Sequence, residues 1–599
     1  MPTPKKILSI ILLSCMAVLS IRPLPAIFKK AWNNVCLAQA QHWDFDILQR
    51  NYHFIFQASH EAQNIIPPDE KITVSFNKNS IQWIAARYAL YPHEIAAGAE
   101  YSLLPPGEQA IREGATLYPL AGGVQLSTTA PIQEKPSRHK NMATRPHAFY
   151  PILLLLLSLS LNGVLGYFLL QILKIHHKEA GKIWFWGTSC LVGNALHSMS
   201  VWILLLFPLP LNQGLLLGTW LSWIIVLLLL GASPQKRIKL NRLAPAQEEK
   251  GGTKRPVFPW AGFSVILIIT AMVIVIALTP LSDWDGLSKW ILKAKVLFLK
   301  QTFDFRYTHQ NYYPLLWPIT VATQFMLTGK VIDMAAQWMS AVYFILCTTQ
   351  IWGGLTILNI PRQPRYYILL IFLPIFFSYR IMATANAENM FLATTAATVT
   401  ALTACIKFPG TKSYGRLACF LLITLALIKF EGAVTVLMLL AGLAVTQKRA
   451  FFQKDNIPLW IGGGGACLLP ALWITWIQSH GYMHSIVHVQ TSTLTQNVLF
   501  LIRENGCRFL SSPVASLLMI LYLLSILHPN TKAWCAVEKW NLWAWAGLFL
   551  FSLLGNAGQS FNEIQNTGKD AFIRLFLHTL PSLTLLISSR MFVRAQDSG

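Results

Sequence analysis

A series of apolar runs constrains the fold of this chain more than any other feature. Most of them approach the roughly 20 residues that a helix needs to cross the hydrocarbon of a bilayer. With 54% hydrophobic and 12% charged residues among 599, the chain is too apolar for a soluble protein. We predict an all-α polytopic membrane protein with about 14 transmembrane helices, whereas the shorter apolar segment 314–329 is expected only to dip into the membrane. The predicted spans are 7–21, 150–173, 183–207, 215–230, 260–281, 333–358, 366–379, 388–406, 416–428, 432–445, 459–477, 513–527, 542–555 and 571–592.

Composition also divides the chain into five parts. Residues 1–28 are predicted to be an N-terminal membrane anchor, because two lysines precede the apolar run; a cleaved signal peptide is the alternative. Residues 29–148 are far more polar, with helical periodicity in 44–66 and a strand pattern in 71–76, and predict a small extracytoplasmic α/β module with its tether. The other parts are an N-terminal transmembrane unit at 149–232, a basic cytoplasmic linker at 233–257 and a transmembrane domain at 258–599.

The distribution of Lys and Arg predicts the orientation of the spans. Cytoplasmic loops of membrane proteins are enriched in these residues, and the linker 233–257 carries seven of them against two glutamates. Placing this linker inside puts the module 29–148 and the loop 282–332 outside, and the other basic loops agree. The same rule accounts for the net charge of +23 without nucleic acid as a partner.

The loop 282–332 breaks this pattern, because it is predicted to lie outside and is nevertheless basic. As a regular α-helix, 287–301 would have apolar residues on one face and three lysines within about 40° of one another on the other. These lysines are Lys289, Lys293 and Lys300. Such a helix is expected to lie in the membrane interface, where its cations favour an anionic lipid headgroup. The alternative is an ordinary solvated face on which Asp285 pairs with Lys289.

Further ionisable residues are predicted at the outer ends of later spans. They are Glu388 in ANAEN, Lys429 and Glu431 in KFEG, and Arg574 and His578 in IRLFLH. A single charged residue at a span end is often only an interface anchor. Several of them on the face predicted for Asp285 suggest a functional site.

These motifs, in this order, resemble a known family. Asp285 begins an Asp-x-x-x-x-Trp pattern that is followed by KAK at 293–295 and HQNYYPLLWP at 309–318. With KFEG and the late Arg574, this looks like the GT-C superfamily of polytopic glycosyltransferases, closest to its bacterial protein-mannosyltransferase-like and Rgt-like members. The resemblance covers about residues 260–592. The additional N-terminal spans, the outer module and NAEN in place of an Asp-containing pair depart from the family pattern.

The resemblance implies a glycosyltransferase of the bacterial inner (cell) membrane with a periplasmic active site. Its donor would be a sugar on a polyprenyl phosphate, its acceptor an extracytoplasmic glycan, lipid or protein, and membrane lipid a further partner. Transfer needs a base for the acceptor hydroxyl and cations for the phosphate leaving group. Asp285 is the expected base. Asp283 is a second catalytic candidate. In a regular helix it would lie about 160° around the axis from Asp285, where it is better placed as a cap.

The resemblance also implies the remaining candidate site residues. The expected phosphate-binding residues are Lys289, Lys293 and Arg574, and the expected substrate-binding residues are His309, Tyr313, Glu388, Lys429, Glu431 and His578. No cofactor or metal is required for a lipid-linked donor, although Asp283 and Asp285 are spaced as in a divalent-ion motif.

Two other functions are open at this point. A transporter or lipid flippase is the first alternative, but repeated halves and charges inside spans, which would favour it, are not evident. A catalytically inactive scaffold that presents the module 29–148 would keep the helices and dispense with Asp285.

Overall fold

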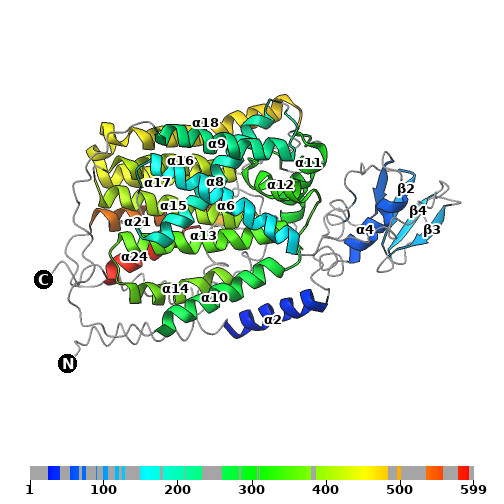
Figure 1. Cartoon of the computed structure of the whole chain (residues 1–599), viewed down its shortest axis with the longest axis horizontal. Coiled ribbons are helices and arrows are strands. Elements are labelled where there is room, and N and C mark those ends of the chain that lie inside the picture. Colours follow the sequence, from blue (N-terminus) through cyan, green and yellow to red (C-terminus); the bar gives the residue numbers. More distant parts are fainter. Residues whose placement is uncertain are drawn as a thin grey trace.

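The computed structural model shows a bundle of long helices with a small sheet beyond one end (Figure 1). Eight helices within the described residues are long and apolar enough to cross a membrane. They are α6 (Phe149–Ile172), α8 (Lys182–Leu205), α9 (Gln213–Ala232), α10 (Pro259–Leu278), α13 (Ala335–Ile357), α15 (Glu388–Lys407), α17 (Phe430–Gln447) and α18 (Ile457–Ser479). The structure describes residues 24–40, 54–66, 70–75, 86, 90, 99–105, 115–120, 124–128, 149–175, 180–207, 209–232, 259–281, 285–305, 308, 310–378, 386–409, 411–482, 496–498, 500, 535–557 and 578–592.

The predicted class of a helical membrane protein with a small sheet is confirmed, but the predicted number of spans is not. Four further helices overlap predicted spans: α14 (Arg362–Ser378), α16 (Lys412–Ile428), α21 (Ala536–Ala557) and α24 (Leu580–Phe592). The predicted spans 7–21 and 513–527 lie outside the described residues.

Helix α12 (Leu316–Thr328) occupies the apolar segment that was predicted not to span. Its 13 residues extend about 20 Å, well short of the roughly 30 Å hydrocarbon core. All but the last two are buried, and the helix packs against α11 (Leu292–Lys300) and α8. Its apolar composition therefore reflects burial inside the protein.

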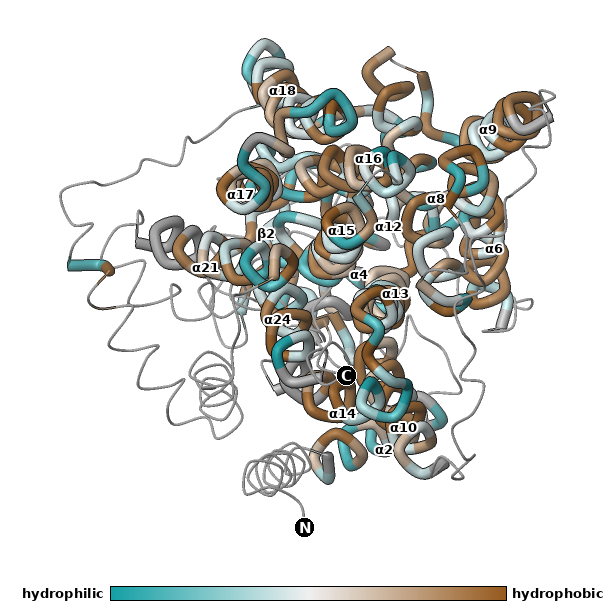
Figure 2. Tube along the Cα trace, turned by 90° about the vertical axis from the view of Figure 1, so that its left-hand side faces the viewer, coloured by the Kyte–Doolittle hydropathy of each residue, from teal (hydrophilic) through white to brown (hydrophobic). Residues whose placement is uncertain are grey.

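Helix α15 is the most enclosed of the eight long helices. In its most apolar stretch 89% of the residues are buried, against 22% in α9 at the periphery. It packs against α13, α16, α21 and α24, and in the view of Figure 2 it lies in the middle of the bundle. Because Glu388 is its first residue, this helix carries a carboxylate at one end of the protein interior.

Helix α8 joins the predicted N-terminal unit to the later helices. A Cβ atom on Gly166 of α6 would lie 1.8 Å from the carbonyl oxygen of Ser189, so glycine is what lets these two backbones touch. On its other sides α8 packs against α12 and α13. The sequence division between 149–232 and 258–599 is therefore not a division in the packing.

The sheet has the strand order β1-β2-β4-β3. Strand β1 (Ile72–Val74) pairs in parallel with β2 (Tyr101–Leu104), whereas β4 (Gln125–Thr128) pairs antiparallel with β2 and β3 (Thr116–Pro119). Strand β1 and helix α4 (Phe54–Ile65) lie in the segments predicted as strand and helix. Figure 1 shows the sheet beyond the end of the bundle that carries α11 and α12.

Helix α2 (Leu24–Ala40) crosses the predicted boundary between residues 28 and 29. It packs against α10, and Asn34 Nδ2 lies 3.4 Å from both the carbonyl oxygen of Val275 and Thr279 Oγ1. The helical assembly therefore begins before the module, and α2 contacts the end of α10 that leads towards Asp285.

Candidate functional site

The segment after Asp285 is not the regular α-helix that the sequence predicted. A π-helix runs from Gly286 to Ile291 and continues directly into α11. An extra residue in a helical turn rotates everything after it by about 100°, and such turns are frequent at functional sites. The prediction of three lysines on one face depended on regular geometry and was wrong.

Each of the three lysines has a different environment. Lys289 Nζ lies 2.6 Å from Asp285 Oδ1, and both side chains are 15% exposed. Lys300 is exposed. Lys293 is completely buried, donates a hydrogen bond of 2.8 Å to the Gln310 carbonyl oxygen and lies 5.9 Å from the centre of the Trp290 ring. Burial, reinforced by Lys289, lowers the pKa of Lys293 to about 7. Lys293 therefore supports the loop that contains Gln310.

The loop that Lys293 supports carries Tyr313. Gln310 adopts a positive φ of 51°, and its carbonyl oxygen also accepts the Tyr313 N–H at 3.2 Å. From α18, Trp473 Nε1 lies 3.1 Å from the Asn311 carbonyl oxygen and 3.2 Å from that of Tyr313. A loop held from two helices orients its tyrosine without a strand or helix of its own.

The KFEG motif forms the joint between α16 and α17. Lys429 is the single extended residue between the two helices, with φ −146° and ψ 154°. A Cβ atom on Gly432 would lie 2.0 Å from the Leu425 carbonyl oxygen, so only glycine allows α17 to start this close to α16. The tight joint directs Lys429 and Glu431, two positions apart, into the same cluster.

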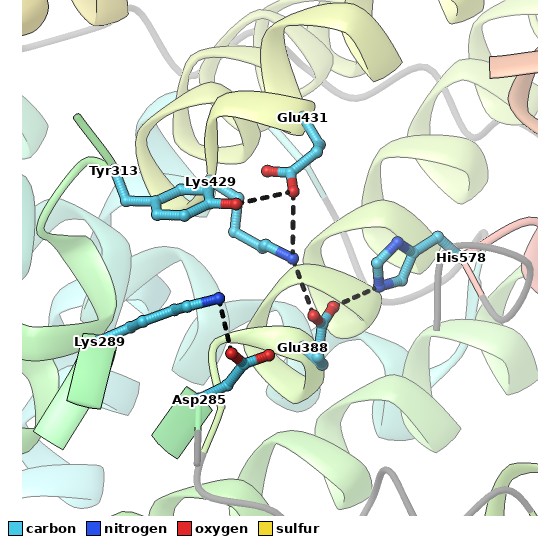
Figure 3. A network of polar contacts seen from close by, with 7 residues as sticks. All are labelled: Asp285, Lys289, Tyr313, Glu388, Lys429, Glu431 and His578. Atoms are coloured by element: carbon cyan, nitrogen blue, oxygen red, sulfur yellow. Dashed lines mark hydrogen bonds and ion pairs between the residues drawn. The ribbon is translucent and has the colours of Figure 1, made fainter. Parts of the chain in front are cut away.

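Lys429 is the centre of a buried polar cluster (Figure 3). Its Nζ lies 2.8 Å from Glu388 Oε1 and 3.6 Å from Glu431 Oε1. Glu388 Oε2 lies 2.9 Å from His578 Nε2, and Tyr313 donates its hydroxyl hydrogen to Glu431 Oε1 at 3.2 Å. The side chains of Lys429, Glu388 and His578 are only 5–7% exposed. Glu388 also lies in the first turn of α15, where the helix dipole favours a negative charge.

The Asp285–Lys289 pair lies beside this cluster. In Figure 3 both of its side chains point towards Lys429 and Glu388. The proximity has an electrostatic effect, because burial and then the negative charges of Glu431 and Asp285 raise the pKa of Tyr313. Burial is the main reason that the pKa of Tyr312 rises to about 12.

Seven predicted site residues are brought together from five separate segments of the chain. They are Asp285, Lys289, Tyr313, Glu388, Lys429, Glu431 and His578. Asp283, His309 and Arg574 lie outside the described residues. Lys293 is close in sequence but is buried under the loop. Tyr312 and Trp290 were not among the predicted site residues, although Trp290 ends the Asp-x-x-x-x-Trp pattern. Their ring centres lie 4.6 Å and 5.1 Å from that of Tyr313.

Chemically, the site combines three carboxyl groups, two lysines and a buried imidazole at one end of an apolar bundle. Such a set can take up a proton, bind hydroxyl groups and hold an anion. Among the described residues, no three His, Cys, Asp or Glu side chains are grouped to hold a metal ion. No family model, curated protein or solved structure matches the chain.

Proposed function

We propose that this protein is a membrane glycosyltransferase of the GT-C type that moves a sugar from a polyprenyl phosphate to an extracytoplasmic acceptor. In this proposal the chain crosses the bacterial inner membrane about 14 times, with the cluster and the module 29–148 on the periplasmic side. The convergence of Asp285 and Lys289 with the Lys429 cluster supports the proposal, because it brings together a base and cations, which transfer from a lipid phosphate requires.

Asp285 is proposed as the base. It takes the proton of the acceptor hydroxyl while that oxygen forms a bond to the anomeric carbon of the sugar. The bond between the anomeric carbon and the phosphate oxygen breaks, and polyprenyl phosphate leaves with the electron pair. A carboxylate on the edge of a largely buried cluster, 15% exposed, is shielded from water and still reachable by a substrate.

Lys289 and Arg574 are proposed as ligands of the phosphate. The Lys289 ammonium is 2.6 Å from Asp285 Oδ1. A phosphate oxygen that takes over this ammonium would leave the carboxylate available as a base. Lys293 has no such role, since its ammonium donates to Gln310; we assign it to the support of the Tyr313 loop.

Asp285→Asn tests this assignment because it keeps the size and the hydrogen bonding of the side chain. Turnover in a transfer assay with polyprenyl-phosphate-linked sugars is expected to fall by about 10²–10⁴. Binding of polyprenyl phosphate should be retained, because the phosphate ligands are unchanged. The matched control is Asp455→Asn, which changes an exposed carboxylate that is paired with Lys412. Full turnover of Asp285→Asn would remove Asp285 as the base.

A transporter or lipid flippase is the competing function, since buried ion pairs inside a helical bundle also line transport pathways. The two functions differ in their products. Vesicles that contain the protein and a lipid-linked sugar should yield a new glycosidic bond if the proposal is correct. Movement of the intact lipid-linked sugar between leaflets without bond formation would favour the flippase instead.

A further inference from the structure

Glu431 has a carboxylate oxygen that the cluster does not use. Its Oε1 accepts the Tyr313 hydroxyl and faces Lys429. Its Oε2 is buried and has no hydrogen-bond partner within the part of the chain that the structure describes. The whole side chain is nevertheless 22% exposed, so the carboxylate is not sealed inside the protein. A buried carboxylate oxygen without a donor is unfavourable, and an O–H or N–H group of a ligand would satisfy it.

The cluster cannot easily supply that donor itself. Lys429 is drawn towards Glu388, at 2.8 Å compared with 3.6 Å for Glu431. Its backbone is fixed in the joint between two helices, and Gly432 has no room for a side chain. Tyr313 has a single hydroxyl hydrogen, which it already donates to Oε1. Among the described residues, Oε2 is therefore an acceptor without a donor, on a backbone fixed by the joint between α16 and α17.

The tyrosine that contacts Glu431 belongs to a group of three aromatic rings. The Tyr312 and Tyr313 ring centres are 4.6 Å apart with an angle of 34° between their planes, and the Trp290 ring centre is 5.1 Å from that of Tyr313. Trp290 is buried, whereas both tyrosines are partly exposed. Aromatic surface with a few fixed polar groups is the usual lining of a small-molecule site. A sugar ring fits this combination, because its C–H face is apolar and its hydroxyl groups are donors.

We propose that Glu431 Oε2 and the rings of Tyr312 and Tyr313 form a subsite for a sugar ring, with the carboxylate oxygen accepting a hydrogen bond from a sugar hydroxyl. This deepens the proposed glycosyl transfer and rests on it only for the source of the ring. The ring belongs either to the lipid-linked donor or to a glycan acceptor, and the two sources are separated by experiment.

Glu431→Gln is the decisive variant. The amide oxygen can still accept the Tyr313 hydroxyl, while an NH₂ group takes the place of Oε2 and cannot accept a hydrogen bond. The full-length protein in detergent micelles is titrated with polyprenyl phosphate, with the same lipid carrying glucose, galactose or mannose, and with soluble neutral oligosaccharides of these sugars. Asp455→Asn is the matched control, as a carboxylate-to-amide change at a surface ion pair.

Loss of one charge-assisted hydrogen bond is expected to weaken sugar binding by about tenfold to a hundredfold. If the ring comes from the donor, Glu431→Gln weakens binding of the lipid-linked sugar and leaves polyprenyl phosphate binding unchanged. If it comes from the acceptor, binding of the oligosaccharide is weakened instead. Tyr312→Leu should weaken binding of the same ligand that Glu431→Gln affects, because it removes the aromatic ring. Tyr312→Phe keeps the ring and should retain most of the binding.

Equal binding by wild type and Glu431→Gln in both arms would overturn the subsite, as would the absence of sugar binding to the wild type. These titrations involve no turnover. A protein that binds sugar through Glu431 and transfers none would keep the subsite and refute the glycosyltransferase. Sugar transfer that is unaffected by Glu431→Gln would support the glycosyltransferase and refute the subsite.

Discussion

Two buried polar regions of this protein differ in almost every respect except burial. One is the cluster around Lys429. The other, here called the amide network, is uncharged and consists of Asn162, Asn194, Trp220, Thr320 and Tyr343 from α6, α8, α9, α12 and α13. Asn162 receives a hydrogen bond of 2.8 Å from Trp220 Nε1 and donates one of 3.1 Å to Asn194 Oδ1. Asn194 in turn donates to Thr320 Oγ1 at 3.3 Å and to the Tyr343 hydroxyl.

The difference shows what each region is for. The amide network pairs donors with acceptors across five helices, and a satisfied neutral network fixes a unique packing at small electrostatic cost. The Lys429 cluster contains charges, borders a π-helix and leaves Glu431 Oε2 without a partner among the described residues. Features of this kind reduce stability and are retained where chemistry needs them. We therefore expect the first region to respond to mutation in stability, and the second in both stability and activity.

The largest effect is expected from Lys429→Met. This change leaves Glu388 and Glu431 buried without their ammonium, and breaking a buried ion pair from one side costs about 3–5 kcal/mol. Denaturant unfolding in mixed micelles measures the loss. Adding Glu388→Gln removes one of the uncompensated charges and should restore part of the stability. A loss below about 1 kcal/mol, as for exposed ion pairs, would mean that water solvates the cluster.

An intermediate effect is expected from a pH series, at the buried Lys293 that supports the Tyr313 loop beside the Lys429 cluster. Burial lowers the pKa of Lys293 from 10.5 to about 7. Below pH 7 the amine is protonated in both states, so the folded protein carries the full cost of a buried ammonium. Between pH 7 and 10.5 only the unfolded chain binds the proton, so the free energy of unfolding rises with pH. The expected rise is about 1 kcal/mol from pH 7 to pH 8.

Lys293→Met should abolish this rise, and unfolding curves of the variant and the wild type at pH 6.5, 7, 8 and 9 provide the measurement. Tyr343→Phe in the amide network is the control and should run parallel to the wild type, because no group of that network changes charge near neutral pH. Parallel curves for Lys293→Met and the wild type would show that folding does not lower the pKa of Lys293.

The sequence was sufficient for features that depend on local composition. Apolar runs of the right length predicted the long helices, and segment 314–329 was recognised as too short to span. The predicted orientation of the spans was enough to group Glu388, Lys429, Glu431 and His578 with Asp285, although these residues are far apart in the chain. Charged residues are rare in apolar surroundings, so each one at a span end carries information about the site.

Features that depend on tertiary contacts were not predictable in the same way. The π-helix violates the regular period on which the lysine face was inferred, and the burial of Lys293 follows from its contact with Gln310, 17 positions later. Strands β2, β3 and β4 were not predicted, and they are held in the sheet by pairing with other strands, which the sequence does not show. Asn162 and Asn194 look like ordinary interruptions of apolar runs until their partners from other helices are known.

The smallest effect is expected from Tyr343→Phe, and it is the most direct test of the comparison. The change removes a hydroxyl that accepts a hydrogen bond from Asn194, while Asn194 keeps Thr320 Oγ1 as an acceptor. The expected loss of stability is about 0.5–1.5 kcal/mol, with unchanged turnover per folded molecule. Tyr313→Phe deletes the same atom next to the charged Glu431 and should also weaken sugar binding. If Tyr343→Phe instead lowers turnover per folded molecule as much as Tyr313→Phe does, the amide network is part of the active machinery, and charge does not distinguish the two regions.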